Sequence, residues 1–191
     1  MKYQTTDFRN GLKIEIDGKP YIVVTCQHVN PGKGSAFVKA RIKNLETGAV
    51  VERNFKAGVD TVDVPDLEEK QMAFTYGDID GYNFMDQETF ESIHLTHDQT
   101  GDNKNYLQEG IIITILYFNG RPLTLDLPNF VFLKVKETDP GLKGDTASGG
   151  SKKAVMETGL QINVPLFIAE GEVLKIDTRT GQYVERAKEA K

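Results

Sequence analysis

The chain has 191 residues, of which 39% are hydrophobic and 27% are charged, and its formal net charge at pH 7 is −5. This composition is that of an ordinary globular protein. The longest nearly apolar run, IIITILYF at 111–118, is far too short for a transmembrane helix.

The charge is unevenly distributed along the chain. Residues 1–64 hold 10 Lys and Arg against 7 Asp and Glu, residues 65–127 hold 3 against 12, and residues 128–191 hold 10 against 9. Because binding to phosphate requires cations, a nucleic-acid partner would meet a basic end of the chain, while the acidic middle repels wrong contacts or faces solvent. A solvated acidic surface that only aids solubility is the alternative.

The first predicted elements form a hairpin. The runs YIVVTCQHV (21–29) and AFVKARIKNL (36–45) are β-branched and partly alternating, which predicts a strand, a loop of about five residues and a returning strand. Lys33 lies at its tip, behind Pro31 and between Gly32 and Gly34, which we expect to permit positive φ and leave the tip unhindered. A Walker loop is rejected, because it needs glycine where Gln27 stands. The alternative reading of Lys33 is a merely solvated tip.

Strand signals continue along the chain, with alternation at 12–17, 36–43 and 130–137 and recurring turn dipeptides such as Asn119-Gly120, and this rhythm predicts a sandwich or barrel. Helical content is expected to be slight: a turn or two at 86–95 with Asp86 as N-cap, and a short piece near 101–110. Prolines interrupt the runs at 62–69 and 125–130. We therefore predict three small domains, 1–64, 65–127 and 128–191, in an elongated string of β-barrels.

Candidate metal and catalytic residues are few. His94 and His97 have no third histidine or cysteine close in sequence, so no metal site is expected. Cys26 and His28 share a strand face, but nothing marks an orienting third group or an oxyanion hole. Cys26 is the single cysteine, which rules out an internal disulfide, and the start of the chain lacks the apolar core of a secretory signal, so we expect a cytoplasmic protein.

The last third contains two candidate RNA contacts. Residues 139–154 are rich in glycine and predict a long loop, whose backbone amides, with Lys143 and Thr146, would hydrogen-bond phosphate or base edges; a flexible linker is the alternative. Tyr183 and Arg186 add an aromatic ring that could stack and a cation that could meet phosphate, or they simply end a strand.

Taken together, these stretches resemble bacterial translation elongation factor P over essentially the whole chain. The similar segments are DFRNGLKIEIDGKPYIV, PGKGSAF, FMDQETFE, LPNFVFLKV, TDPGLKGDTA and VPLFIAEGEVLKIDTRTGQYVERA, in the order and spacing of that family. The resemblance implies an all-β protein with an SH3-like (KOW-like) first domain and two OB-like barrels, L-shaped and tRNA-like in outline. It also implies a cytoplasmic monomer that is not a stand-alone enzyme and needs no cofactor or metal.

The resemblance further implies a role on the 70S ribosome, between the peptidyl-tRNA and exit sites, that relieves stalling at consecutive prolines. Lys33 matches a position that a lysine-modifying enzyme extends in many members, and contacts peptidyl-site tRNA. Gly144, Asp145 and Thr146 resemble the loop that approaches the exit-site mRNA codon, and Tyr183 and Arg186 resemble contacts with the small subunit.

The tip residue also separates relatives. Lys33 argues against the paralogous branch and the sugar-modified branch, which carry arginine there, and the third segment excludes the two-domain hypusine-bearing relative. Two rival hypotheses remain: a general single-strand RNA-binding protein using its OB-like barrels, and a hydrolase using Cys26 and His28.

Overall fold

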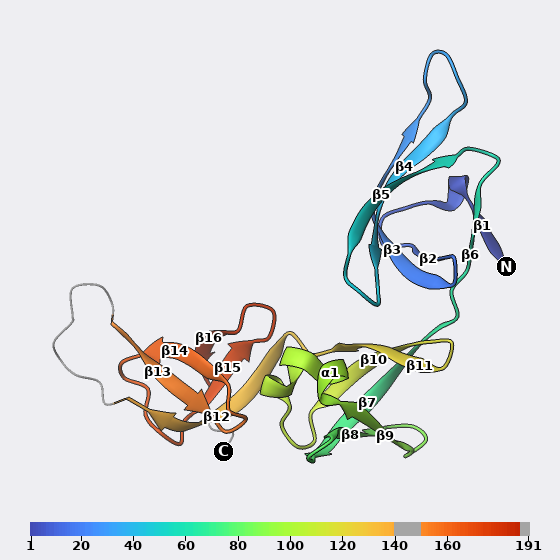
Figure 1. Cartoon of the computed structure of the whole chain (residues 1–191). Helices are drawn as coiled ribbons and strands as arrows, with labels where there is room; N and C mark the ends of the chain where they lie inside the picture. The colour runs from blue at the N-terminus through green and yellow to red at the C-terminus, as the bar shows by residue number, and fades with distance from the viewer. Residues whose placement is uncertain (140–149, 188–191) are drawn as a thin grey trace. The chain divides into compact units, whose positions relative to one another are not determined.

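The computed structural model describes residues 1–139 and 150–187, which form three antiparallel sheets in chain order (Figure 1). The expectation of an all-β fold built from barrel-like sheets is confirmed. The strands cluster into two compact units, residues 1–69 with 115–124, and residues 70–114 with 125–191. The boundaries of the three domains stay a prediction.

The first sheet has the order β1-β6-β2-β3-β4-β5. Its elements are β1 (Lys2–Gln4), the 3-10 helix η1 (Thr5–Asp7), β2 (Lys13–Ile16), β3 (Lys19–Val29), β4 (Phe37–Asn44), β5 (Val50–Lys56) and β6 (Thr61–Asp63). The alternation predicted for 36–43 places Val38, Ala40 and Ile42 in the core and the residues between them in solvent. The side chains on the inner face thus hold β4 in one register.

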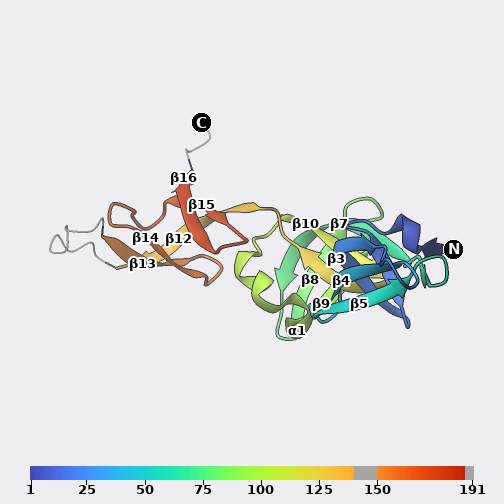
Figure 2. The same cartoon turned by 90° about the horizontal axis from the view of Figure 1, so that it is seen from above.

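The second sheet has the order β11-β10-β7-β8-β9. Its strands are β7 (Leu67–Gly77), β8 (Gly81–Asp86), β9 (Ser92–Thr96), β10 (Ile112–Phe118) and β11 (Arg121–Asp126), and a helical segment of α1 (His97–Thr100) and η2 (Gly101–Tyr106) follows β9 (Figure 2). The apolar run at 111–118 lies in β10, where Ile113 and Ile115 are fully buried. The apolar residues of this run are therefore part of the hydrophobic core.

The prediction of a helix over 86–95 is wrong, whereas the short piece near 101–110 is confirmed as η2. Asp86 ends β8, and its carboxylate accepts hydrogen bonds from the backbone N–H groups of Glu88 (2.7 Å) and Thr89 (3.1 Å). An aspartate makes the same bonds in a turn as at a helix N-terminus, so the local signal was ambiguous. Here the turn leads directly into β9.

The third sheet has the order β14-β13-β12-β15-β16. Its strands are β12 (Phe130–Thr138), β13 (Ser151–Met156), β14 (Gln161–Pro165), β15 (Val173–Asp177) and β16 (Gln182–Arg186). Residues 151–154, which the sequence assigned to a long loop, belong to β13. Ala154 pairs with Ile162 there, and both are buried, so packing decides their structure.

Candidate functional site

The hairpin of β3 and β4 presents the tip residues. The two strands pair from Tyr21 and Asn44 to Val29 and Phe37, and residues 30–36 connect them. Figure 1 shows this loop extending beyond the body of the first sheet. The predicted hairpin is therefore confirmed, and its base is anchored by Val38 and Ala40, which have no exposed surface.

The four tip residues Pro31, Gly32, Lys33 and Gly34 are all exposed. Gly34 adopts a φ of 115°, and a side chain there would also approach the Pro31 ring, with Cβ 3.8 Å from its Cγ. Gly32 does not have a positive φ, so the expectation holds for only one of the two glycines. A side chain at Gly32 would meet open space, so conformational need explains glycine at 34 but not at 32.

The Lys33 ammonium has no ion-pair partner within 4.0 Å among the residues that the structure describes. Lys39, farther along β4, does have such a partner, because its Nζ lies 2.9 Å from Glu52 Oε1. An unpaired, exposed cation on a protruding loop can neutralise an anionic group of another molecule without first breaking an internal contact.

Tyr183 and Arg186 both lie on β16, but their side chains make different contacts. Tyr183 is half-buried and packs against the core of the third sheet. Arg186 Nη1 donates to Glu172 Oε1 at 2.8 Å. The pKa of Glu172 is lowered, first by the hydrogen bond from the Ala169 backbone and then by Arg186. Arg186 would therefore have to share its charge between Glu172 and a phosphate.

The remaining RNA-contact candidates, Gly144, Asp145 and Thr146, lie outside the described residues, as does Lys143.

His94 and His97 bind the turn between β7 and β8 rather than one another. His94 Nε2 lies 3.4 Å from Asp78 Oδ1, and His97 Nε2 lies 3.2 Å from the carbonyl oxygen of Ile79. The pKa of Asp78 is lowered to about 2, chiefly by the hydrogen bond from Asn83. Within residues 1–139 and 150–187 no group of three His, Cys, Asp or Glu side chains could hold a metal ion.

Cys26 and His28 lie on β3, and among the described residues the hydrogen-bond contact of the thiol is with an amide. Cys26 Sγ is 3.8 Å from Asn10 Oδ1, which also accepts the Cys26 backbone N–H at 3.1 Å. Asn10 thus holds this part of β3 in place. Since an amide cannot remove the proton of a thiol, these contacts do not activate Cys26 as a nucleophile.

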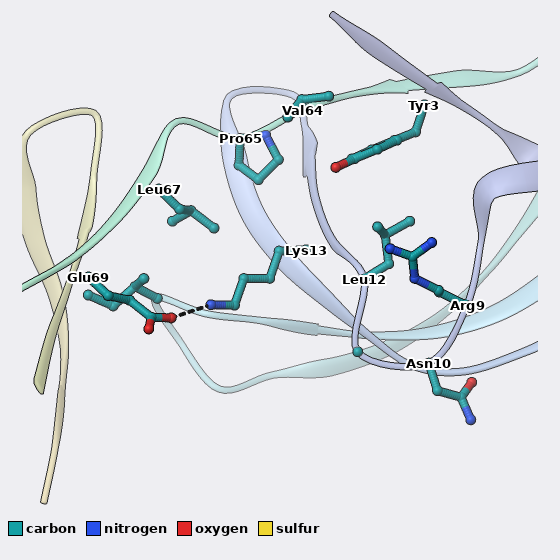
Figure 3. Close-up of a pocket in the computed structure, with 11 residues that line it drawn as sticks. Tyr3, Arg9, Asn10, Leu12, Lys13, Val64, Pro65, Leu67 and Glu69 are labelled. Atoms are coloured by element: carbon teal, nitrogen blue, oxygen red, sulfur yellow. Dashed lines mark hydrogen bonds and ion pairs between the residues drawn. The ribbon is translucent and has the colours of Figure 1, made fainter.

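A depression in the first unit has a volume of about 550 Å³ (Figure 3). It is lined by Tyr3, Arg9, Asn10, Gly11, Leu12, Lys13, Val64, Pro65, Leu67, Glu69 and Leu116. Lys13 Nζ and Glu69 Oε1 form an ion pair of 2.8 Å across it, as Figure 3 shows. Lys13 and Glu69 therefore neutralise each other, and a ligand would have to break this ion pair to use either charge.

A second groove, in the third sheet, was missed by sequence reasoning. It is lined by Lys153, Gln161, Ile162, Asn163, Gly181, Gln182 and Tyr183, and we call it the seam groove. The available signal was the alternation of exposed Gln161 and Asn163 with buried Ile162 and Val164 on β14. Nothing in the sequence alone brings that strand next to β16.

No helix in the described part of the chain has the length and apolar character needed to cross a membrane. A first sheet with a protruding lysine hairpin, followed by two further barrel-like sheets, places the chain in the class of multidomain β proteins built from KOW-like and OB domains. Three family models match in that order: the elongation factor P KOW-like domain at residues 4–60, the elongation factor P OB domain at 67–125, and the elongation factor P C-terminal domain at 131–186. The expected KOW-like and OB-like architecture is thereby confirmed.

The similar curated proteins carry the same name. Elongation factor P of Moorella thermoacetica is 54% identical over 183 residues, covering 96% of this chain and 98% of that protein. Elongation factor P of Natranaerobius thermophilus is 51% identical over 184 residues, covering 96% and 97%. The chain belongs to the elongation factor P family, as its sequence resemblance indicated.

Solved structures support the fold alone. A eukaryotic translation initiation factor 5A from Methanococcus jannaschii superposes with a TM-score of 0.54 at 20% identity, covering 64% of this chain and 90% of that one. A translation initiation factor eif-5a family protein from Naegleria fowleri gives a TM-score of 0.53 at 14% identity, covering 66% and 98%.

Proposed function

We propose that this translation elongation factor binds the 70S ribosome between the peptidyl-tRNA and exit sites and relieves stalling at consecutive prolines through Lys33. The observation that supports this is the exposed Lys33 ammonium, which has no ion-pair partner within the described residues and lies on a loop stiffened by Pro31. The strands below it are anchored in a buried core, so the loop is presented on a rigid base.

The physical role of Lys33 is to orient peptidyl-site tRNA. Proline has a fixed φ and a secondary amine, which makes the reacting groups of two prolines hard to align. A cation against the acceptor end of the tRNA neutralises phosphate and holds the ester in a productive pose. Restoring a step slowed a hundredfold requires about 2.7 kcal/mol, which a few charge-assisted hydrogen bonds supply. The ribosome performs the chemistry, so the factor is not itself an enzyme and uses no cofactor.

The proposal includes contacts that rest on motif resemblance. Gly144, Asp145 and Thr146 would approach the exit-site codon, and Tyr183 and Arg186 would contact ribosomal RNA of the small subunit. Since Arg186 already donates to Glu172, its contact with phosphate would be shared. The factor acts as a monomer in the cytoplasm.

The first experiment measures synthesis of a peptide with three consecutive prolines in a reconstituted system. It compares reactions without factor, with the native protein, with Lys33→Ala and with Lys39→Ala, a control that removes an exposed lysine of the same hairpin. We expect the native protein and Lys39→Ala to relieve the pause and Lys33→Ala to fail. Full activity of Lys33→Ala, or no effect of the native protein, would show that the proposal is wrong.

The second experiment tests modification of Lys33 by an enzyme of the native host. The protein is purified from that host, and the peptide containing Lys33 is measured by mass spectrometry. We expect added mass on Lys33 and none on Lys39. A Lys33 peptide with only its sequence mass would remove the modification from the proposal while leaving the role of the lysine open to the translation assay.

A second candidate function is general binding of single-stranded RNA. It is supported by two exposed aromatic residues on one face of β12, Phe130 and Phe132, and by Lys175, whose Nζ lies 4.7 Å from the centre of the Phe130 ring. Aromatic rings next to cations form stacking platforms for unpaired bases. Filter binding without ribosomes separates the two candidates, because only a general binder would retain single-stranded RNA of every sequence tightly.

A further inference from the structure

The seam groove lies where the two edge strands of the third sheet approach each other. β14 and β16 are the ends of the order β14-β13-β12-β15-β16, so each is hydrogen-bonded to one neighbour in the sheet. They nevertheless lie in contact, as the adjacent ribbons in Figure 1 show. Within the described residues no ladder joins these two strands, so their outward-facing backbone groups at the seam are not used in sheet pairing.

The groove has a volume of about 490 Å³ and a polar lining. Gln161 and Asn163 come from β14, and Gln182 and Tyr183 from β16. The three amides each offer both donors and acceptors, and the tyrosine offers a ring face and a hydroxyl.

The charge of the lining is positive. Lys153 is its cation, and no carboxylate is among the lining residues. The acid nearest in register, Asp177 opposite Gln182, is already bound by Arg179 through contacts of 3.0 and 2.6 Å. An anionic ligand would therefore meet an ammonium without facing an unpaired carboxylate from the lining strands.

We propose that the seam groove binds one unpaired nucleotide of RNA, with adenine preferred. The amides of Gln161, Asn163 and Gln182 would read the base edge, because an amide presents the donor and acceptor pair that matches adenine. Tyr183 would contact the base plane, and Lys153 the phosphate. The inference deepens the proposed function and rests on it, since the ribosome is the source of RNA.

An extended peptide fits the groove less well. Peptides that add to a strand edge obtain specificity from pockets for alternate side chains. Here Ile162 is the apolar member of the lining and is 7% exposed, so the groove offers a peptide little apolar surface. Amides with a cation suit a base with a phosphate.

The test uses the full chain without ribosomes. Single-stranded hexaadenylate and hexauridylate RNA are titrated into 15N-labelled protein, and binding is followed by NMR and by fluorescence anisotropy. We expect shift changes on β14 and β16 and tighter binding of hexaadenylate. The double variant Asn163→Ala with Gln182→Ala should weaken hexaadenylate binding by about tenfold or more. These side chains are exposed, so the variant keeps its core.

The matched control is Asn54→Ala, an exposed amide on β5, which should change the affinity by less than about twofold. Three outcomes would overturn the inference: no measurable binding, unchanged binding by the double variant, or shift changes confined to another surface such as Phe130 and Phe132.

The translation assay gives an independent answer. A chain that relieves the proline pause but leaves the groove unperturbed keeps the proposed function and rejects the nucleotide site. A chain that binds hexaadenylate in the groove while Lys33→Ala remains fully active keeps the site and rejects the role of Lys33.

Discussion

Gly81 is a position where the backbone leaves no room for any side chain. A Cβ there would lie 2.1 Å from the carbonyl oxygen of Leu95, on the paired strand β9. We expect Gly81→Ala to lower the free energy of unfolding by about 1–3 kcal/mol, because the two strands must move apart. Urea denaturation measures the change.

The matched control for that substitution is Gly32→Ala at the hairpin tip, where a Cβ meets open space and φ is not positive. Its unfolding free energy should stay within about 0.5 kcal/mol of the native value. Equal stability of Gly81→Ala and Gly32→Ala would contradict the close approach of β8 and β9.

The carboxyl group of Asp177 makes the stability of the third sheet depend on pH in the acid range. The pKa of its carboxyl is lowered from 3.8 to about 2, first by the side-chain hydrogen bond from Arg179. Because the folded state holds the charged form more strongly than the unfolded state does, this stabilisation is present above pH 4 and is lost as the pH falls toward 2.

The corresponding experiment compares the native protein with Asp177→Asn in thermal unfolding from pH 6 down to pH 2. We expect the difference in Tm to shrink as the pH falls through this window. A difference that stays constant would mean that the carboxylate charge contributes nothing.

The candidate site was predictable only where its residues are neighbours in sequence. The β-branched runs on either side of PGKGS predicted the hairpin and its exposed Lys33, because local strand pairing determines both. Arg186 ends β16, which was one of the two alternatives that the sequence left open, but its bond to Glu172 depends on how β15 and β16 pair. The seam groove depends on contact between strands separated by the whole of β15, which no local pattern records.

Among the elements, α1 depends on its cap. Thr96 accepts the Gln99 backbone N–H at 3.3 Å, and the Gln99 side chain accepts the Thr96 backbone N–H at 2.9 Å. A helix this short cannot sustain itself by propagation, so the two reciprocal bonds hold its first turn. The sequence reading missed this start because it assigned helix to the acidic residues before β9.

We expect Thr96→Ala to lower the free energy of unfolding by about 0.5–2 kcal/mol and Thr96→Ser to preserve it, because serine keeps the capping oxygen. Urea denaturation with a circular-dichroism signal measures both variants. A Thr96→Ser protein as unstable as Thr96→Ala would show that the methyl group, not the cap, is what matters.

At the scale of the whole molecule, the second unit contains most of the second sheet together with the third sheet. Thr158 Oγ1 donates to the carbonyl oxygen of Asn105 at 2.6 Å, and Gln108 Nε2 donates to Glu157 Oε1 at 3.1 Å. Tyr106 packs against the core of the third sheet, and its burial raises the pKa of its hydroxyl. These contacts predict that both parts of the unit open together.

Native-state hydrogen exchange tests this coupling. In the native protein we expect β8 and β12 to exchange with similar free energies of opening. Tyr106→Ala should separate the two by roughly 2 kcal/mol, whereas Tyr76→Ala, which removes an exposed tyrosine, should not. Separate opening in the native protein would show that the two sheets are independent.

Three sheets in chain order also affect how the protein is made. The first sheet is complete within residues 2–63, since β1 pairs with β6 and every strand between them lies in that stretch. A chain leaving the exit tunnel can therefore close this sheet before the second has been synthesised. Its hairpin would then be shaped early, and an enzyme that recognises the folded tip could reach Lys33 while translation of the same chain continues.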